Sequence, residues 1–250
     1  MAERGKSEYS QSVTNALRLL GCFVDREERG ISELSRELGL SKSAVARIVA
    51  SLEDGRLLMQ NPETGKYRLG TGFLLYGSLV RERNELSRAL APALAQLAEK
   101  YQSTAHLAVL DGGELTIVNK VSAGPFVYMS SRVGGTLPIH ASATGKCILA
   151  WLPPERRREL IENAELRRYT ATTITDPDAL ETELAAIRER GYALDDGETH
   201  EGLFCVGYPV FDASGRVAAA VSVSGSRAAL EPRLSEGGAS IRDELKNYGI

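Results

Sequence analysis

The spacing of apolar residues near the amino terminus predicts three helices, over residues 12–24, 31–38 and 42–54. Gly39 ends the second segment, and Ser41 stands where its hydroxyl can cap the third. Two short helices joined by a tight glycine turn indicate a helix-turn-helix. The positions predicted to be buried are Val13, Ala16, Leu17, Leu20 and Phe23 or Val24 in the first helix, Leu34 and Leu38 in the second, and Val45, Ile48, Val49 and Leu52 in the third.

The third predicted helix carries a small and basic face opposite its apolar positions. At about 100° per residue this face holds Ser43, Arg47 and Ala50, and it is flanked by Lys42 and Ala46. Small side chains let a helix approach base edges, and an arginine can bond a guanine through two hydrogen bonds. The face therefore suits contact with DNA. A solvated face on an ordinary three-helix bundle is the alternative.

A two-stranded ribbon is predicted over residues 55–70 by an apolar run, a turn at 61–65 and the alternation of Tyr67 and Leu69. Helices followed by such a ribbon form a winged helix, and the tip of the wing can lie near a minor groove. The cationic side chains of the ribbon can then straddle a phosphate backbone. The predicted DNA-contacting residues are Ser41, Lys42, Ser43, Arg47, Lys66 and Arg68.

An amphipathic linker helix is predicted from Thr71 to about Arg88, with a broad apolar face that has no obvious partner in its own domain. Such a face is a candidate contact between two copies of the chain, as recognition of two-fold symmetric DNA would require. Leucines continue at helical spacing as far as Tyr101. We expect Pro92 to kink the chain or to separate the linker from the next helix.

The pattern changes from helical to alternating after Ser103. Residues 105–121 predict a hairpin with an Asp-Gly-Gly turn, and residues 203–225 repeat this pattern. Two helical segments, at 145–152 and 179–192, lie between the hairpins. This order predicts an α+β fold with an antiparallel sheet.

One face of the second hairpin is lined by small or polar residues. A few hydroxyls and a thiol in a mainly apolar hollow can orient a small ligand. Simple packing against small-residue helices is the alternative. A period of two residues places Ala218, Ala220, Ser222 and Ser224 on this face, together with Cys205, Gly207 and Pro209 of the partner strand.

The stretch HASATGKC, residues 140–147, is similar to the phosphate-binding loop G-x-x-x-x-G-K-[ST]. It lacks the first glycine and the final hydroxyl of that loop, because His140 and Cys147 hold those positions. Ser142 instead predicts the N-cap of an apolar helix, whose free N–H groups can hold an anion. The carboxylate of a small metabolite would suit this helix start, and we expect Lys146 on the exterior of the helix.

The composition is that of a globular protein with a net charge of -3 and 43% hydrophobic residues. No apolar run approaches the roughly 20 residues of a membrane helix, and the first residues do not form a signal peptide, so a cytoplasmic location is expected. Residues 38–52 contain Lys42 and Arg47 and no acid, which places a local basic face on a nearly neutral domain. The three widely spaced cysteines suggest neither a disulfide framework nor a zinc ribbon.

An enzyme or a metal site is the competing hypothesis. The residue types of a cysteine hydrolase or a metal centre are present, but they show no local ligand spacing. We therefore predict no catalytic residue, no metal ligand and no cofactor. The residues concerned are His140, His200, Cys147, Cys205 and the pair Asp195 and Asp196.

The order of these motifs resembles the IclR family of bacterial transcriptional regulators over essentially the whole chain. The match is carried by LPIHASATGKCILAWL and by a later segment with Asp195, Asp196, Gly202, Cys205 and a final V-S-V-S-G. The resemblance implies a GAF-like effector-binding domain and assembly as a homodimer or a dimer of dimers on palindromic promoter DNA. The domains it implies are a winged helix-turn-helix at 1–70, a linker and dimerisation helix at 71–88, and an effector-binding domain at 89–250.

The same resemblance implies that the effector is a small organic acid: an aromatic, hydroxy or keto acid. Its carboxylate would meet the loop at Ala143 and Thr144. Many relatives have Gly-Ala at these two positions, so the Thr144 hydroxyl is expected to alter ligand preference. The implied effector-binding residues are Met129, Leu137, Ile139, Ala143, Thr144, Asp195, Cys205, Ser222 and Ser224.

Overall fold

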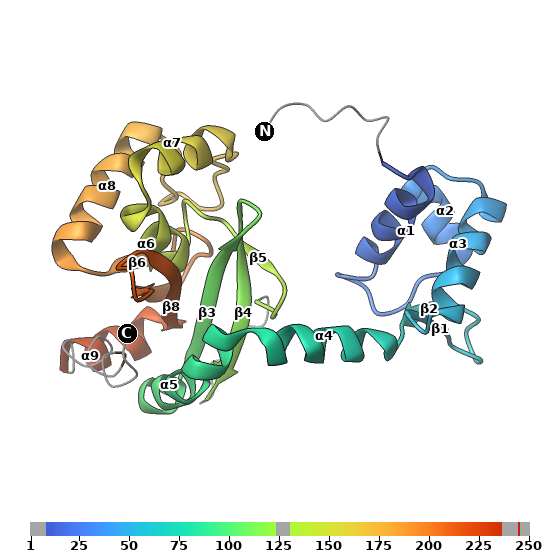
Figure 1. Ribbon diagram of the computed structural model, residues 1–250, viewed down its shortest axis with the longest axis horizontal. Coiled ribbons are helices and arrows are strands. Elements are labelled where there is room, and N and C mark those ends of the chain that lie inside the picture. Colours follow the sequence, from blue (N-terminus) through green and yellow to red (C-terminus); the bar gives the residue numbers. More distant parts are fainter. Residues whose placement is uncertain (1–8, 124–130, 237–244, 246–250) are drawn as a thin grey trace. The chain divides into compact units, whose positions relative to one another are not determined.

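The computed structural model describes residues 9–123, 131–236 and 245. The chain divides into two units, Met1–Arg83 and Asn84–Ile250, and each unit has its own hydrophobic core (Figure 1). In the described part of the chain, no helix is long and apolar enough to cross a membrane.

The first unit contains the predicted helix-turn-helix and ribbon. Its helices are α1 (Gln11–Gly21), α2 (Ile31–Leu38), α3 (Lys42–Asp54) and α4 (Gly72–Arg83), and its strands β1 (Leu58–Gln60) and β2 (Tyr67–Leu69) pair antiparallel. Gly39 ends α2 with a φ of 67°, a conformation that glycine adopts without strain. Ser41 caps α3, because its Oγ accepts a hydrogen bond from the backbone N–H of Ala44. Both end signals read from the sequence are therefore confirmed.

The predicted burial of the first helical segment is confirmed only in part. Phe23 lies in the core as predicted, together with Leu19 and Cys22, whereas Val13 and Leu17 are 58% and 64% exposed. Apolar residues occupy two faces of this helix, and spacing alone does not determine which face packs. The other residues predicted to be buried in this segment are half-buried (Ala16, Leu20) or exposed (Val24).

The linker and the next helix separate at Asn84 rather than at Pro92. Asn84 caps α5 (Glu85–Tyr101), since its side-chain oxygen accepts a hydrogen bond from the backbone N–H of Ser87. Pro92 lies inside α5, which buries Leu90 and Leu94. A side-chain cap sets this boundary, and the predicted helix spacing of the leucines is retained through the proline.

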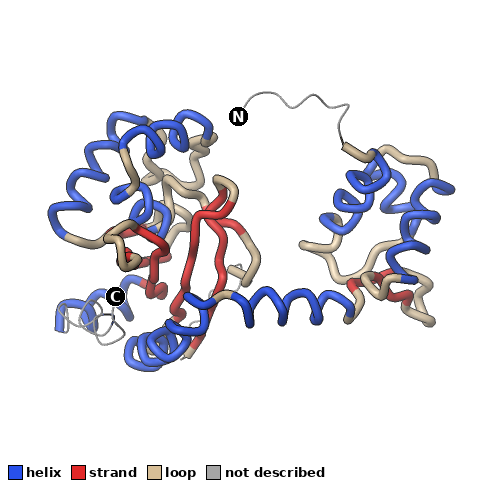
Figure 2. The backbone as a smooth tube through the Cα atoms, in the orientation of Figure 1, coloured by secondary structure: helices blue, strands red, loops and turns tan. Residues whose placement is uncertain are grey.

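The second unit is built on a six-stranded antiparallel sheet in the order β5-β4-β3-β8-β7-β6. Helix α5 packs on one face of the sheet, and α6 (Ala143–Trp151), α7 (Pro154–Asn163) and α8 (Pro177–Arg190) share a core on the other face (Figures 1 and 2). Helix α9 (Arg227–Glu236) contacts β7 and β8. The strands are β3 (Thr104–Asp111), β4 (Glu114–Ser122), β5 (Thr136–Leu137), β6 (Ala193–Asp196), β7 (Leu203–Phe211) and β8 (Val217–Ser226).

Both predicted hairpins are present. Gly112 and Gly113 turn β3 into β4 with φ values of 58° and 96°. In the β7–β8 hairpin the bulky side chains, such as Val206 and Val221, enter the core under α5. The face with small and polar residues is turned toward α6, as Ala220 and Cys205 show. This division of the two faces places polar groups inside the domain.

Candidate functional site

A row of polar side chains crosses the sheet of the second unit. Ser122 of β4 pairs with Thr104 of β3, and Thr104 pairs with Ser224 of β8. The row continues through Cys205 of β7 to Asp195 of β6. Directly paired residues of antiparallel strands have their side chains on the same face. These side chains therefore lie in one line on the face that α6 covers.

A second row runs beside the first. Lys120 of β4, His106 of β3 and Ser222 of β8 pair in register, and the row continues through Gly207 of β7 to Ala193 of β6. Nε2 of His106 and Oγ of Ser131 are hydrogen-bonded at 2.9 Å, while Nζ of Lys120 donates to the carbonyl of Ser131 at 2.8 Å. Burial, together with the charge of Lys120, lowers the pKa of His106 to about 4. The imidazole is therefore neutral at neutral pH.

Helix α6 begins beside these rows. Ser142 caps it through a hydrogen bond that its Oγ accepts from the N–H of Gly145, and the other first-turn N–H groups have no intrahelical acceptor. Ala143 lies against Gly207 of β7. Thr144 is 1% exposed, and its hydroxyl has no hydrogen-bond partner among the described residues. Such a hydroxyl costs about 1–3 kcal/mol, which a polar group bound to it would offset.

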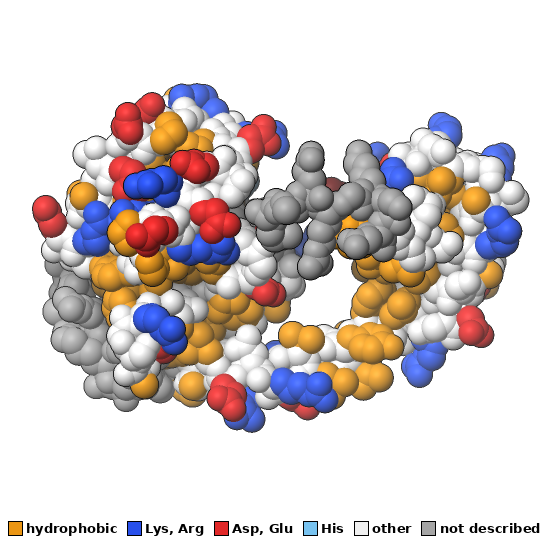
Figure 3. Space-filling model, turned by 45° about the horizontal axis from the view of Figure 1, so that its top comes forward, with side chains coloured by type: hydrophobic (Ala, Val, Ile, Leu, Met, Phe, Trp, Pro, Cys, Tyr) orange, Lys and Arg blue, Asp and Glu red, His pale blue; other side chains and the backbone are white. Residues whose placement is uncertain are grey.

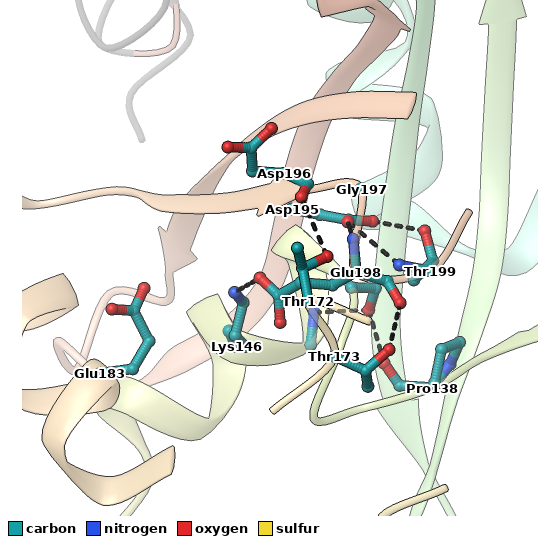
Figure 4. A network of polar contacts seen from close by, with 12 residues as sticks. Pro138, Lys146, Thr172, Thr173, Glu183, Asp195, Asp196, Gly197, Glu198 and Thr199 are labelled. Atoms are coloured by element: carbon teal, nitrogen blue, oxygen red, sulfur yellow. Dashed lines mark hydrogen bonds and ion pairs between the residues drawn. The ribbon is translucent and has the colours of Figure 1, made fainter. Parts of the chain in front are cut away.

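Lys146 points into the domain, so the prediction that it lies on the exterior of α6 is wrong. Lys146 is 1% exposed, and its Nζ forms an ion pair with Oε1 of Glu198 (Figure 4). Burial raises the pKa of Glu198 to about 7, although the charge of Lys146 acts to lower it. A lysine is almost never fully buried unless it is paired. Its partner lies 52 positions away, where a local pattern could not reveal it.

Asp195 holds the turn that carries Glu198. Its Oδ1 accepts hydrogen bonds from the backbone N–H groups of Glu198 and Thr199 at 2.7 and 3.2 Å, and its Oδ2 accepts one from the Thr199 hydroxyl at 2.5 Å. Burial raises the pKa of Asp195 despite these hydrogen bonds. Burial and the charge of Asp195 also raise the pKa of the neighbouring Cys205 thiol well above its usual range. Cys205 is therefore a neutral thiol beside a structural carboxylate.

The structure brings most of the predicted effector residues together. Six of them lie at the start of α6 or in the polar rows beside it: Ala143, Thr144, Asp195, Cys205, Ser222 and Ser224. Leu137 and Ile139 instead pack in the apolar core shared by α6 and α8. Met129 lies outside the described residues.

Sequence reasoning missed His106, Lys120, Thr104 and Glu198. The first three stand at alternate positions of their strands, so the period of two residues that selected Ser222 could have selected them too. Glu198 follows the strand β6 in a turn, and no periodicity applies there.

The outer face of α3 is exposed as predicted. Lys42, Ser43, Arg47 and Ala50 all face solvent, whereas Val45 and Val49 are buried. The Oγ atoms of Ser41 and Ser43 lie 3.1 Å apart at the start of the helix. A basic, small-residue surface is thus presented on one side of this helix.

The predicted wing residues are partly engaged within the unit. Nζ of Lys66 lies 3.4 Å from Oε1 of Glu33 on α2. A guanidinium nitrogen of Arg68 lies 3.6 Å from the sulfur of Met59 across the ribbon. The turn of the wing is also bonded to the rest of the unit, since the side-chain amide of Asn61 donates to a carboxylate oxygen of Glu28 at 2.6 Å. Part of the positive charge of the wing is therefore neutralised by acids of its own domain.

Several of the residues considered for an enzyme or a metal centre form hydrogen bonds within the second unit. In the described part of the chain, no group of three or more His, Cys, Asp or Glu side chains is arranged to hold a metal ion. His140 is hydrogen-bonded through Nε2 to the carbonyl of Arg167 at 3.0 Å. Cys147 donates to the carbonyl of Gly207, and burial raises the pKa of its thiol to about 12. A reactive thiolate is disfavoured at such a site.

Two family descriptions match this chain. Residues 12–62 match the IclR helix-turn-helix domain, and residues 79–247 match the bacterial transcriptional regulator IclR C-terminal domain. The chain is 35% identical to the HTH-type transcriptional regulator XynR of Escherichia coli (strain K12) over 242 residues, 96% of this chain and 94% of that protein. It is 32% identical to the transcriptional repressor IclR of the same organism over 244 residues, 96% and 89% of the two chains.

Solved structures agree with these matches. The crystal structure of the Thermotoga maritima IclR has a TM-score of 0.76 and 31% identity, and the match covers 95% of each chain. An IclR homolog from Microbacterium hydrocarbonoxydans, crystallised in complex with 4-hydroxybenzoate, has a TM-score of 0.76 and 29% identity, with 94% and 99% covered. The chain therefore belongs to the IclR family of bacterial transcriptional regulators, with a helix-turn-helix DNA-binding domain and a C-terminal effector domain.

Proposed function

We propose that the protein is a ligand-responsive regulator that binds palindromic promoter DNA through α3 and a small organic acid at the start of α6. The observation that carries the effector half of this proposal is the buried Thr144 hydroxyl, which has no partner among the described residues. The observation that carries the DNA half is the exposed basic face of α3, with Arg47 at its centre.

On the DNA side, Arg47 is proposed to read a guanine and Lys42 to contact phosphate. The hydroxyls of Ser41 and Ser43, at the start of the same helix, add short polar contacts. Lys66 and Arg68 extend the interface from the wing. The contribution of Lys66 is weaker, because its ion pair with Glu33 partly neutralises its charge. This division follows the general rule that phosphate contacts position a helix and base contacts give specificity.

Palindromic DNA calls for two copies of the chain, and α4 is the proposed contact. None of its residues is buried, and four of its large apolar side chains are between 58% and 72% exposed, whereas Phe73 and Leu79 are half-buried. Figure 3 shows this apolar surface along the helix. Exposed apolar patches of this kind mark interaction surfaces. A homodimer, or a dimer of dimers, would cover the side chains Leu74, Leu75, Tyr76 and Val80.

On the effector side, the carboxylate is proposed to accept from the free N–H groups at Ala143 and Thr144. The Thr144 hydroxyl and the hydroxyls of Ser222 and Ser224 supply further hydrogen bonds around it. The family neighbour that holds 4-hydroxybenzoate supports an organic acid as the ligand class. Within that class we propose an aromatic, hydroxy or keto acid.

The proposal includes neither catalysis nor a cofactor. The two buried thiols of the second unit, Cys147 and Cys205, have raised pKa values, which does not favour nucleophilic chemistry. We place the protein in the cytoplasm, where promoter DNA is accessible.

A thermal-shift screen of small carboxylates tests the effector half, because a ligand that binds only the folded state raises the melting temperature. Pyruvate, lactate and 4-hydroxybenzoate represent the three acid classes. We expect at least one to stabilise the wild type and to lose its effect in Ser222→Ala plus Ser224→Ala, while DNA affinity is unchanged. A screen without any stabilising acid would contradict the proposal, and equal loss of DNA affinity would indicate misfolding of the variant.

A further inference from the structure

Three ionisable side chains are buried together between α6 and the turn after β6: Lys146, Asp195 and Glu198. Lys146 pairs with Glu198, and the backbone N–H of Glu198 donates to Asp195 (Figure 4). With both carboxyls ionised and the lysine protonated, this cluster has one negative charge in excess. Charges buried in the interior of a domain are weakly screened, so this excess charge is unfavourable.

The two carboxylates of the cluster are not equally well stabilised. Both oxygens of Asp195 accept hydrogen bonds from the turn. In Glu198, Oε1 faces Lys146, but Oε2 is buried and accepts no hydrogen bond among the described residues. Burial also raises the pKa of Glu198 to about 7. Glu198 is therefore the acid of this cluster that gains a proton most easily.

The charged groups that surround Glu198 come from every element packed against it. Lys146 on α6 favours its ionised form, whereas Asp195 on β6 and Glu183 on α8 oppose it. Glu183 is ion-paired with Arg190 of the same helix at 2.6 Å. His140, which precedes α6, has its pKa lowered by burial and by Lys146. Among the described residues, Lys146 is the one cation in ion-pair contact with Glu198.

We propose that the effector acid binds together with one proton, which Glu198 takes up from solvent. This inference rests on the proposed function, because it needs a carboxylate at the start of α6. That carboxylate would be held two to three residues before Lys146, beside the row of side chains that ends at Asp195. A further negative charge in this buried region is costly unless one of the acids is neutralised.

The proton balance of this step is simple. The effector enters as its carboxylate, Glu198 changes from carboxylate to carboxylic acid, and the proton comes from the buffer. No bond of the effector forms or breaks. The ammonium group of Lys146 then offsets the charge of the effector carboxylate instead of that of Glu198.

The coupling predicts a direction for the pH dependence of affinity. Below about pH 7 Glu198 is largely protonated before the acid arrives, so affinity is nearly constant there. Above that pH the proton must be taken up on binding, and affinity falls by up to about tenfold per pH unit. The effector carboxyl, with a pKa below about 5, is ionised from about pH 6 upward and adds no slope there. His106, with a pKa of about 4, stays neutral over the same range.

Isothermal titration calorimetry in two buffers of different ionisation enthalpy, phosphate and Tris at about pH 7.5, measures the proton directly. The probe is whichever of pyruvate, lactate and 4-hydroxybenzoate gives the largest thermal shift. We expect the binding heats of the wild type to differ between the buffers by an amount that corresponds to uptake of up to one proton. In Glu198→Gln the acid still binds and the difference disappears. Glu201→Gln, which changes an exposed acid in the same turn, keeps the wild-type difference.

The outcomes separate the two proposals. Binding with equal heats in both buffers would overturn proton uptake and leave the proposed function in place. Full uptake in Glu198→Gln would assign the proton to another group and overturn the role of Glu198. The absence of any bound acid would overturn the proposed function and this inference with it.

Infrared spectroscopy of the wild-type protein tests the same proton uptake if Glu198→Gln does not fold. In wild-type protein labelled with carbon-13 at its glutamate carboxyls, addition of the same acid should produce the band of a labelled, protonated carboxyl group. A difference spectrum without that band would overturn the proposal.

Discussion

Gly207 of β7 lies directly against Ala143, the first residue of α6. A Cβ atom built on Gly207 would stand 2.8 Å from the carbonyl oxygen of Ala143 and 3.1 Å from its Cβ atom. Backbone-to-backbone approach of this kind sets how close α6 sits to the sheet. The N–H groups of the first turn of this helix are thereby placed beside the polar rows.

Gly207→Ala should therefore push α6 away from the sheet and destabilise the second unit by about 1–3 kcal/mol. Urea denaturation followed by circular dichroism measures the change in the free energy of unfolding. Gly225→Ala is the matched control on β8, because a Cβ there would meet its nearest neighbour at 3.6 Å, an ordinary contact. Equal effects of the two substitutions would contradict the close-contact argument.

At about pH 8, where Glu198 is largely ionised, Lys146→Met should cost about 3–5 kcal/mol of stability, because it leaves the Glu198 carboxylate buried without its cation. Adding Glu198→Gln to this variant removes the unpaired charge and should recover a large part of the loss. The exposed pair Arg156 and Glu159 gives the comparison, since Arg156→Ala should cost no more than about 1 kcal/mol. Thermal and urea unfolding of the wild type and of these three variants measure the changes in the free energy of unfolding. A double variant as unstable as Lys146→Met alone would contradict the role of the unpaired Glu198 charge.

His106 should make stability depend on pH in acid solution. Burial lowers its pKa from 6.5 to about 4. The stability contributed by the neutral imidazole is complete above pH 6.5 and falls as the pH falls toward 4, by up to about 3 kcal/mol in total. Glu198 acts in the opposite direction, because its raised pKa lowers stability as the pH rises from 4.5 to about 7. The stability difference between wild type and His106→Gln isolates the histidine, and a difference that stays constant from pH 7 to pH 4 would refute this account.

Lys42 and Lys66 should differ in their contribution to DNA binding. Lys42 is exposed on α3, whereas Nζ of Lys66 lies 3.4 Å from Oε1 of Glu33 and forms an ion pair with it. Lys42→Ala should reduce the slope of log affinity against log salt by about 1, and Lys66→Ala should reduce it by less. Fluorescence anisotropy with a labelled duplex over a range of salt concentrations measures both slopes. A larger effect of Lys66→Ala would show that the wing, and not α3, supplies the main phosphate contact.

Much of the fold could be predicted from local pattern. The turn glycines, the caps at Ser41 and Ser142 and the alternation of Ser222 and Ser224 each act through nearby backbone, so the sequence displays them directly. Helix α1 shows the limit of this reasoning, because its apolar residues fit two faces and tertiary packing selected Leu19.

The candidate site was predicted less completely because its parts meet across the sheet. His106 and Lys120 reach the site through strand pairing, and Glu198 reaches Lys146 from a distant turn. A buried lysine needs a buried partner, and residue spacing along one segment contains no information about that partner. The outward placement predicted for Lys146 failed for this physical reason.

The account depends most on the outer face of α3 as the surface that reads DNA. Affinity and base preference for duplexes selected from a random-sequence pool should be measured for wild type, Arg47→Ala and Arg158→Ala, the last of which removes an exposed arginine from α7 in the second unit. Arg47→Ala should weaken binding by about tenfold to a hundredfold and relax the preference at one base pair of each half-site, while Arg158→Ala leaves both unchanged. Unchanged affinity and unchanged base preference in Arg47→Ala would contradict the account.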